Sequence, residues 1–130
     1  MPASITDLLS INLEKGGKGF RSENQKLTLI DRLSVINAIP DPFERAAYLA
    51  MVIIREQPFK DANHRTAAGA AIGEVGILTR RTSAEMETWI RSLHVDGGTG
   101  MDILMLSERD ERNPVATGRR TIIRYLEGDA

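Results

Sequence analysis

The chain has 130 residues, which is enough for one domain with a substantial hydrophobic core. Its 17 basic and 18 acidic residues give a net charge of −1, so charge offers no reason to expect direct binding to nucleic acid or to an anionic membrane. It contains no cysteine, which excludes disulfide bonds and thiolate zinc sites. Because its first residues do not form a secretion signal and no 18-residue apolar run occurs, we expect a single cytoplasmic domain over residues 1–130 without membrane contact.

The first two predicted elements are amphipathic helices. Apolar residues at helical spacing predict a helix over residues 5–14, which ends at the cluster Gly16-Gly17-Lys18-Gly19. That cluster lacks the spacing of a nucleotide-binding P-loop, so Lys18 is interpreted as a solvated turn residue. A second helix is expected over residues 24–38. The inward-facing apolar residues of the two helices are predicted to be Ile5, Leu8, Leu9, Leu13, Leu29, Leu33 and Ile36.

The third predicted helix has the strongest start signal in the sequence. Asp41 is suited to the N-cap, Pro42 to the first helical position and Glu44 to the position three residues after the cap. This helix is expected to run to about Glu56. It is followed by residues 57–66, Gln-Pro-Phe-Lys-Asp-Ala-Asn-His-Arg-Thr.

The segment after this helix combines a helix stop with a helix start. Pro58 cannot continue the preceding helix, and Asp61 and Asn63 are residue types that satisfy free amides where a new helix begins, near Ala62 or Asn63. The first-turn N–H groups and the positive end of the helix dipole form an anion site, to which Arg65 and His64 add side-chain donors. Asp61 supplies an oxygen ligand suited to a divalent cation held against phosphate. An ordinary capped helix start with a solvated charge cluster is the alternative.

Further helices are predicted after this segment. The small residues from Thr66 onward, with Gly69, Gly73 and Gly76, predict a central helix on which neighbouring helices pack closely. Ser83 is expected to cap a helix that contains Trp89, which is interpreted as a core or interface anchor. A terminal helix is expected to open at Asn113-Pro114 and to carry a solvated or partner-facing stripe of Arg119, Arg120 and Arg124.

The order of residues in segment 57–66 resembles the signature of the Fic/Doc family, His-x-Phe-x-Asp/Glu-Gly/Ala-Asn-Gly/Lys-Arg. The chain matches this signature at Phe59, Asp61, Ala62, Asn63 and Arg65. Pro58 is commonly found at its position in Fic members. Ala62, and Ala68 in place of a second arginine, make the chain more similar to Doc, the death-on-curing branch of toxins.

This resemblance implies an all-α, compact Fic/Doc-like helical bundle, in which a central helix follows the loop that carries the signature. It also implies Mg²⁺ as cofactor and ATP or another nucleoside triphosphate as substrate, with Asp61 as the metal ligand. Nucleotide or phosphate contacts are implied for Phe59, Ala62, Asn63, His64 and Arg65. Catalytic roles are implied for position 57, where Gln57 stands, and for Asn63 and Arg65.

Two residues depart from the family pattern. Family members use a histidine at the position of Gln57 as the general base that deprotonates the attacking hydroxyl, and a carboxamide has no basic lone pair for this near neutral pH. Gln57 is either a substitution introduced to silence a toxin that kills its expression host or a natural variant. His64 stands where Fic enzymes have glycine and Doc has lysine. It is bulky and can be cationic, which favours the Doc arrangement and phosphoryl transfer.

Three function classes are consistent with these residues. The first is a Doc-like toxin of a toxin–antitoxin module, which transfers a phosphoryl or nucleotidyl group to a protein hydroxyl. With Gln57 in place of the general base, this chain is expected to be inactive. Elongation factor Tu is the target of Doc itself, so the resemblance implies a target such as a translation factor. The second is a natural Fic-like pseudoenzyme that binds nucleotide or protein without transfer, and the third is an interaction module. We favour the first, because Asp61, Asn63 and Arg65 together have little use in a scaffold that binds no phosphate.

The resemblance also implies a separate antitoxin polypeptide. Many Fic proteins inhibit themselves through the pattern Ser/Thr-x-x-x-Glu-Gly/Asn. Only Ser10 to Glu14 comes near this pattern, and Lys15 follows where glycine or asparagine is required.

Overall fold

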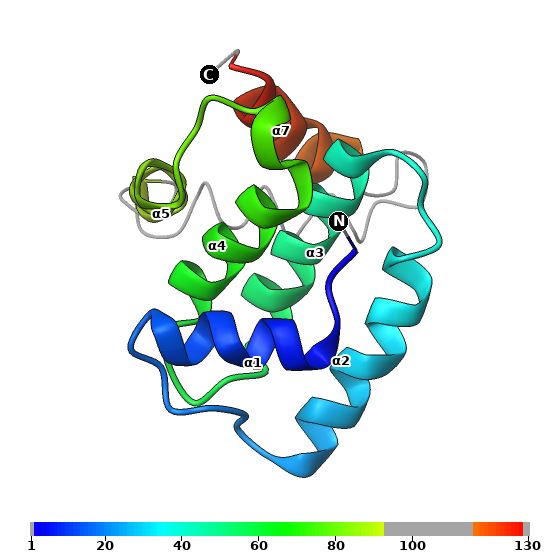
Figure 1. Ribbon diagram of the computed structural model, residues 1–130, viewed down its shortest axis with the longest axis vertical. Coiled ribbons are helices and arrows are strands. Elements are labelled where there is room, and N and C mark those ends of the chain that lie inside the picture. Colours follow the sequence, from blue (N-terminus) through cyan, green and yellow to red (C-terminus); the bar gives the residue numbers. More distant parts are fainter. Residues whose placement is uncertain (1, 93–115, 129–130) are drawn as a thin grey trace.

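The computed structural model describes residues 2–92 and 116–128. This part of the chain contains helices and no β-strand, so the all-α expectation is confirmed. The α-helices, labelled as in Figure 1, are α1 (Ile5–Glu14), α2 (Glu23–Ile36), α3 (Pro42–Glu56), α4 (Asn63–Val75), α5 (Ser83–Ser92) and α7 (Ala116–Glu127). A short 3-10 turn, Gly76–Leu78, follows α4. No helix in these residues is both long and apolar enough to cross a lipid bilayer.

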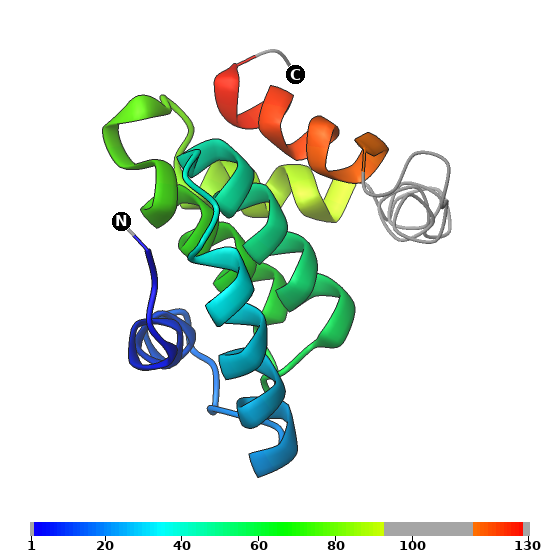
Figure 2. The same cartoon turned by 90° about the vertical axis from the view of Figure 1, so that its right-hand side faces the viewer.

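Helices α3 and α4 form the antiparallel pair at the centre of the bundle (Figures 1 and 2). Helix α1 crosses the lower part of α4 in Figure 1, and α2 packs against α3. Helix α5 packs on α4, and α7 packs on α3. The loop that joins α3 to α4 therefore lies at the lower end of the bundle, where the turn after α1 also lies.

The central pair is buried because its residues are apolar or small on most sides. Helix α3 is buried over most of its length, including Leu49, Val52 and Ile53. Helix α4 presents alanines to its neighbours, and a Cβ at Gly69 would lie only 2.9 Å from Cγ2 of Ile11 in α1. The prediction of close helix packing is thus confirmed at Gly69. It is wrong at Gly73, where a Cβ would meet nothing within 4 Å.

The predicted helix starts are mostly confirmed. The Asp41 carboxylate accepts the backbone N–H of Glu44 at 3.0 Å, and Pro42 is the first residue of α3. At α5 the cap is Thr82 instead of the predicted Ser83. The Thr82 hydroxyl accepts the N–H of Glu85 at 3.1 Å, and the Glu85 carboxylate accepts the N–H of Thr82 at 3.0 Å, which is a capping box.

Aromatic contacts join the last described helix to the bundle. Trp89 stacks on Tyr125 with ring centroids 4.2 Å apart, so it is an anchor between α5 and α7, as predicted. The Arg119 guanidinium lies 4.8 Å from the Tyr48 ring centroid and packs on α3, so the prediction of a solvated or partner-facing residue is wrong for Arg119. The predicted start at Asn113-Pro114 lies outside the described residues.

Candidate functional site

The loop between α3 and α4, residues 57–62, is called the motif loop below. Its first and last residues, Gln57 and Ala62, have φ of 46° and 58° and are the only non-glycine residues with positive φ in the described part of the chain. This left-handed conformation costs side-chain-bearing residues about 1–3 kcal/mol each. The surrounding structure must therefore hold both ends of the loop in place.

Asn63 holds the middle of the motif loop. Its side-chain oxygen accepts the N–H of Phe59 at 3.1 Å, and its side-chain nitrogen donates to the carbonyl of Phe59 at 3.0 Å. We expected Asn63 to satisfy amides at the start of α4, and this was wrong, since no side chain caps that helix. The fully buried ring of Phe59 stacks on Phe20 with centroids 5.0 Å apart, which anchors the loop in the core.

The turn after α1, residues 16–21, lies alongside the motif loop and is called the glycine turn below. The N–H of Arg21 donates to the carbonyl of Pro58 at 2.8 Å, and the N–H of Lys60 donates to the carbonyl of Gly19 at 2.9 Å. The N–H of Lys18 donates to the Asp61 carboxylate at 2.8 Å. Lys18 is an exposed turn residue as predicted, but its backbone also fixes the side chain of Asp61.

Asn12 joins α1 to both segments and was missed by the sequence analysis. It is fully buried. Its side-chain nitrogen donates to the carbonyl of Asp61 at 3.0 Å and to the Thr66 hydroxyl at 3.1 Å, and its side-chain oxygen accepts the N–H of Gly19 at 2.9 Å. Because Asn12 follows Leu8 by four residues, the two side chains lie on the same, inward face of α1. The prediction that Leu13 faces inward was wrong, since Leu13 is 53% exposed.

Arg65 and His64 lie in the first turn of α4, and both are partly buried. The Nε of Arg65 is buried and has no hydrogen-bond partner among the described residues. The backbone of Gly16 runs close to the same guanidinium, since a Cβ at Gly16 would lie 3.7 Å from Nη1 of Arg65. A buried guanidinium N–H without an acceptor is costly, because it has lost its water without gaining another partner.

Asp61 is the single carboxylate of the motif loop. It is partly buried, and one of its oxygens is held by the N–H of Lys18. No group of three or more His, Cys, Asp or Glu side chains that could hold a metal ion occurs in the described residues. The chain alone therefore provides one carboxylate ligand here, which is the usual protein contribution where phosphate oxygens and water complete the shell of Mg²⁺.

Arg21 also holds position 57 through its side chain. Its Nε donates to the carbonyl of Gln57 at 3.1 Å, and its Nη2 donates to the carbonyl of Phe59 at 3.4 Å. Hydrogen bonds from charged groups contribute about 1.5–3 kcal/mol, and less where the group is exposed, as Arg21 is. These hydrogen bonds therefore offset part of the cost of the left-handed conformation at Gln57.

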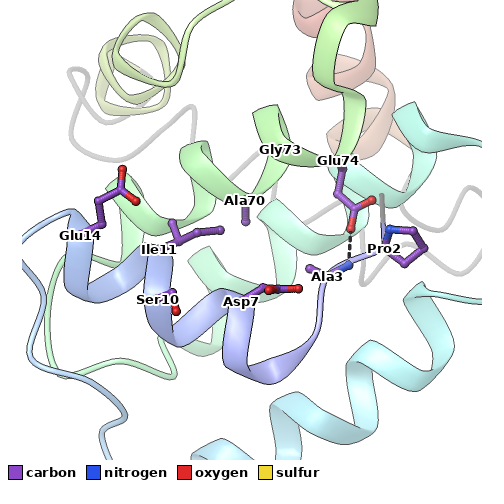
Figure 3. Close-up of a pocket in the computed structure, with 9 residues that line it drawn as sticks. All are labelled: Pro2, Ala3, Asp7, Ser10, Ile11, Glu14, Ala70, Gly73 and Glu74. Atoms are coloured by element: carbon purple, nitrogen blue, oxygen red, sulfur yellow. Dashed lines mark hydrogen bonds between the residues drawn. The ribbon is translucent and has the colours of Figure 1, made fainter.

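Two surface pockets lie near these elements. One, of about 530 Å³, is formed where α2 begins and α3 ends and is lined by Ser22, Asn24, Gln25, Thr28 and Glu56. It adjoins Arg21 and Gln57 in sequence. The other, of about 320 Å³, lies between the N-terminal segment, α1 and α4 (Figure 3). None of its lining residues belongs to the motif loop, so it is separate from the candidate site.

Two carboxylates of the pocket in Figure 3, Asp7 and Glu74, make hydrogen bonds within the fold. Asp7 accepts the backbone N–H of Ser4 at 2.9 Å, and this is the main reason why its pKa is lowered. Glu74 accepts from Arg45 at 3.1 Å and from the N–H of Ala3 at 3.0 Å. Ser10 and Glu14, which only approached the inhibitory pattern, line this pocket.

Comparison with known proteins returned no match to a family model, a curated protein or a solved structure. The family resemblance therefore rests on the residues of segment 57–66.

Proposed function

We propose that the chain is a Doc-like member of the Fic/Doc family, which binds a nucleoside triphosphate with Mg²⁺ at the motif loop and the start of α4. The proposed reaction is transfer of the terminal phosphoryl group to a protein hydroxyl. Gln57 stands at the position of the general base, so the protein with Gln57 has little transfer activity. The observation that carries the proposal is the buried, unpartnered Nε of Arg65 beside a helix start that no side chain caps.

The start of α4 has the properties of an anion site. Its N-cap residue, Ala62, makes no side-chain cap hydrogen bond, and the helix dipole adds positive potential at this end. Arg65 lies in the same turn, and an oxyanion beside it would supply the acceptor that its Nε lacks. A helix start alone would be weak support, but the buried Nε of Arg65 without an acceptor is an independent observation that supports an anionic ligand.

The residues present also fit Mg²⁺. Asp61 offers one carboxylate. The N–H of Lys18 binds this carboxylate and fixes its orientation, and the side-chain nitrogen of Asn12 binds the backbone carbonyl of Asp61. A bound Mg²⁺ would neutralise charge that develops on the phosphate oxygens. Because a single carboxylate holds Mg²⁺ weakly, Asp61 is expected to bind the ion together with the triphosphate and not by itself.

The role of position 57 follows from the balance of the transfer step. The target hydroxyl oxygen forms a bond to the terminal phosphorus, the bond to the bridging oxygen breaks, and the nucleoside diphosphate leaves. The hydroxyl proton must go to a base, and the Gln57 carboxamide cannot take it near neutral pH. Gln57 nevertheless keeps the left-handed backbone and the exposed position at the end of α3.

His64 determines our choice between the two transfer reactions. It lies in the first turn of α4, where Fic enzymes have the small glycine that admits the inner phosphates. A bulky side chain that can carry positive charge favours the arrangement of Doc, which transfers the terminal phosphate. Ala68 replaces the second arginine that would hold the outer phosphates during nucleotidyl transfer.

A natural pseudoenzyme is the second candidate, and Gln57 itself is the observation that favours it. It would bind the same ligand through Arg65 and would transfer nothing. We further propose cytoplasmic location, a target such as a translation factor and a separate antitoxin. The antitoxin is proposed because Ser10 and Glu14 lie in the separate pocket of Figure 3 and Lys15 breaks the inhibitory pattern.

Triphosphate binding is expected to depend on Arg65. Titration calorimetry should show Mg²⁺-dependent binding of at least one nucleoside triphosphate, with a dissociation constant on the order of 1 μM to 1 mM, as is typical of substrates. Arg65→Ala should weaken this binding about 10–100-fold, because it removes a charge-assisted donor. The matched control is Arg91→Ala, which removes an exposed arginine of α5 and should change nothing. No binding of any triphosphate, or equal binding by both variants, would rule out the phosphate site.

A further inference from the structure

Position 57 is held by an arginine from a distant part of the chain. The N–H of Gln57 still belongs to α3, since it donates to the carbonyl of Ile53 at 3.0 Å. Its carbonyl has left the helix and accepts from Nε of Arg21 at 3.1 Å. The backbone therefore changes direction at Gln57, between its N–H and its carbonyl, and φ at this residue is 46°.

Arg21 contacts three consecutive residues of the motif loop. Its backbone N–H binds the carbonyl of Pro58 at 2.8 Å, and its side chain spans the carbonyls of Gln57 and Phe59. The fixed fork geometry of a guanidinium allows one side chain to orient two carbonyls. Asn63 also fixes Phe59, through the two hydrogen bonds described above, and both of these bonds go to Phe59. Arg21 therefore binds the carbonyls on both sides of Pro58, where the chain leaves α3.

We propose that Arg21 is a positioning residue for the side chain at position 57. It holds that residue in the left-handed conformation, and the direction of the side chain follows from this conformation. The inference rests on the proposed function, because it gives the residue at position 57 a role in transfer. It assigns no contact with substrate to Arg21.

The first test is made with Gln57 in place and needs no transfer activity. Arg21→Ala should change the Cα and Cβ chemical shifts of Gln57, because the backbone is no longer held in the left-handed region. Lys18→Ala is the matched control, since it removes another exposed side chain of the glycine turn and keeps the backbone N–H that holds Asp61. Unchanged Gln57 shifts in Arg21→Ala would overturn the proposal, whatever the function of the chain.

The second test uses the Gln57→His background. Arg21→Ala should lower the rate of label transfer at saturating ATP about 10–100-fold, as expected for a misplaced catalytic group, and leave the KM for ATP within about twofold. Arg21→Lys, which can still reach one carbonyl, should recover part of the rate. An equal loss in rate and ATP affinity, or no loss, would overturn the proposal. Failure of the proposed function would look different: Gln57→His would be inactive while the Gln57 shifts still depended on Arg21.

Discussion

Replacement of Gln57 by histidine is expected to raise transfer from a nucleoside triphosphate by about 10²–10⁴-fold, the usual contribution of a positioned general base. Histidine is among the residues that tolerate the left-handed backbone found at this position, so the substitution fits the loop. The assay is incorporation of label from ATP into proteins of a bacterial lysate, followed by intact-mass spectrometry of the labelled protein. The mass should increase by one phosphoryl group.

Two controls separate base catalysis from other effects. Gln57→Asn keeps a carboxamide and should remain as inactive as the Gln57 protein. Gln57→His combined with Arg65→Ala should lose most of the gain, because the phosphate is no longer held. Strong transfer by the Gln57 protein itself would place the base elsewhere and make His64 the first candidate. A nucleotide adduct from the Gln57→His protein would contradict the Doc-like assignment.

Gly17→Ala is expected to lower the free energy of unfolding by about 2–4 kcal/mol, through overpacking and the loss of buried hydrogen bonds. A Cβ at Gly17 would overlap the carboxamide of Asn12, which is fully buried and cannot move without losing its bonds to Asp61, Thr66 and Gly19. Urea denaturation followed by circular dichroism measures the change.

Gly73→Ala is the matched control for this prediction. A Cβ there would meet nothing within 4 Å, and the residue lies within α4. Alanine is the better helix former, so Gly73→Ala should raise stability by about 0.5–1 kcal/mol. Equal effects of the two substitutions would mean that the contact of Asn12 with the glycine turn is not as described.

Elements with local signals were predictable from the sequence. The start of α3 was predicted from Asp41 and Pro42, and both act as expected because a cap depends on residues within one turn. The start of α4 was also placed correctly, near Asn63. The buried face of α2 followed from the helical spacing of Leu29 and Leu33.

The support of the motif loop was not predictable in the same way. Asn12 and Arg21 act on residues 36 to 54 positions away, and no local pattern encodes such contacts. The sequence also did not indicate the left-handed conformation of Gln57 and Ala62, because neither residue is a glycine and tertiary contacts hold the backbone there. Candidate site residues were therefore identified by type, whereas the residues that position them required the structure.

Amide chemical-shift mapping with Mg²⁺ and ATP tests the central claim most directly, because it locates the ligand. The largest changes should fall on the backbone N–H groups of Asn63, His64 and Arg65, with smaller ones in the glycine turn beside Arg65. The changes should shrink in Arg65→Ala. No change at the start of α4 at millimolar ATP, or changes confined to the pocket between α1 and α4 in Figure 3, would contradict a phosphate site at the motif loop.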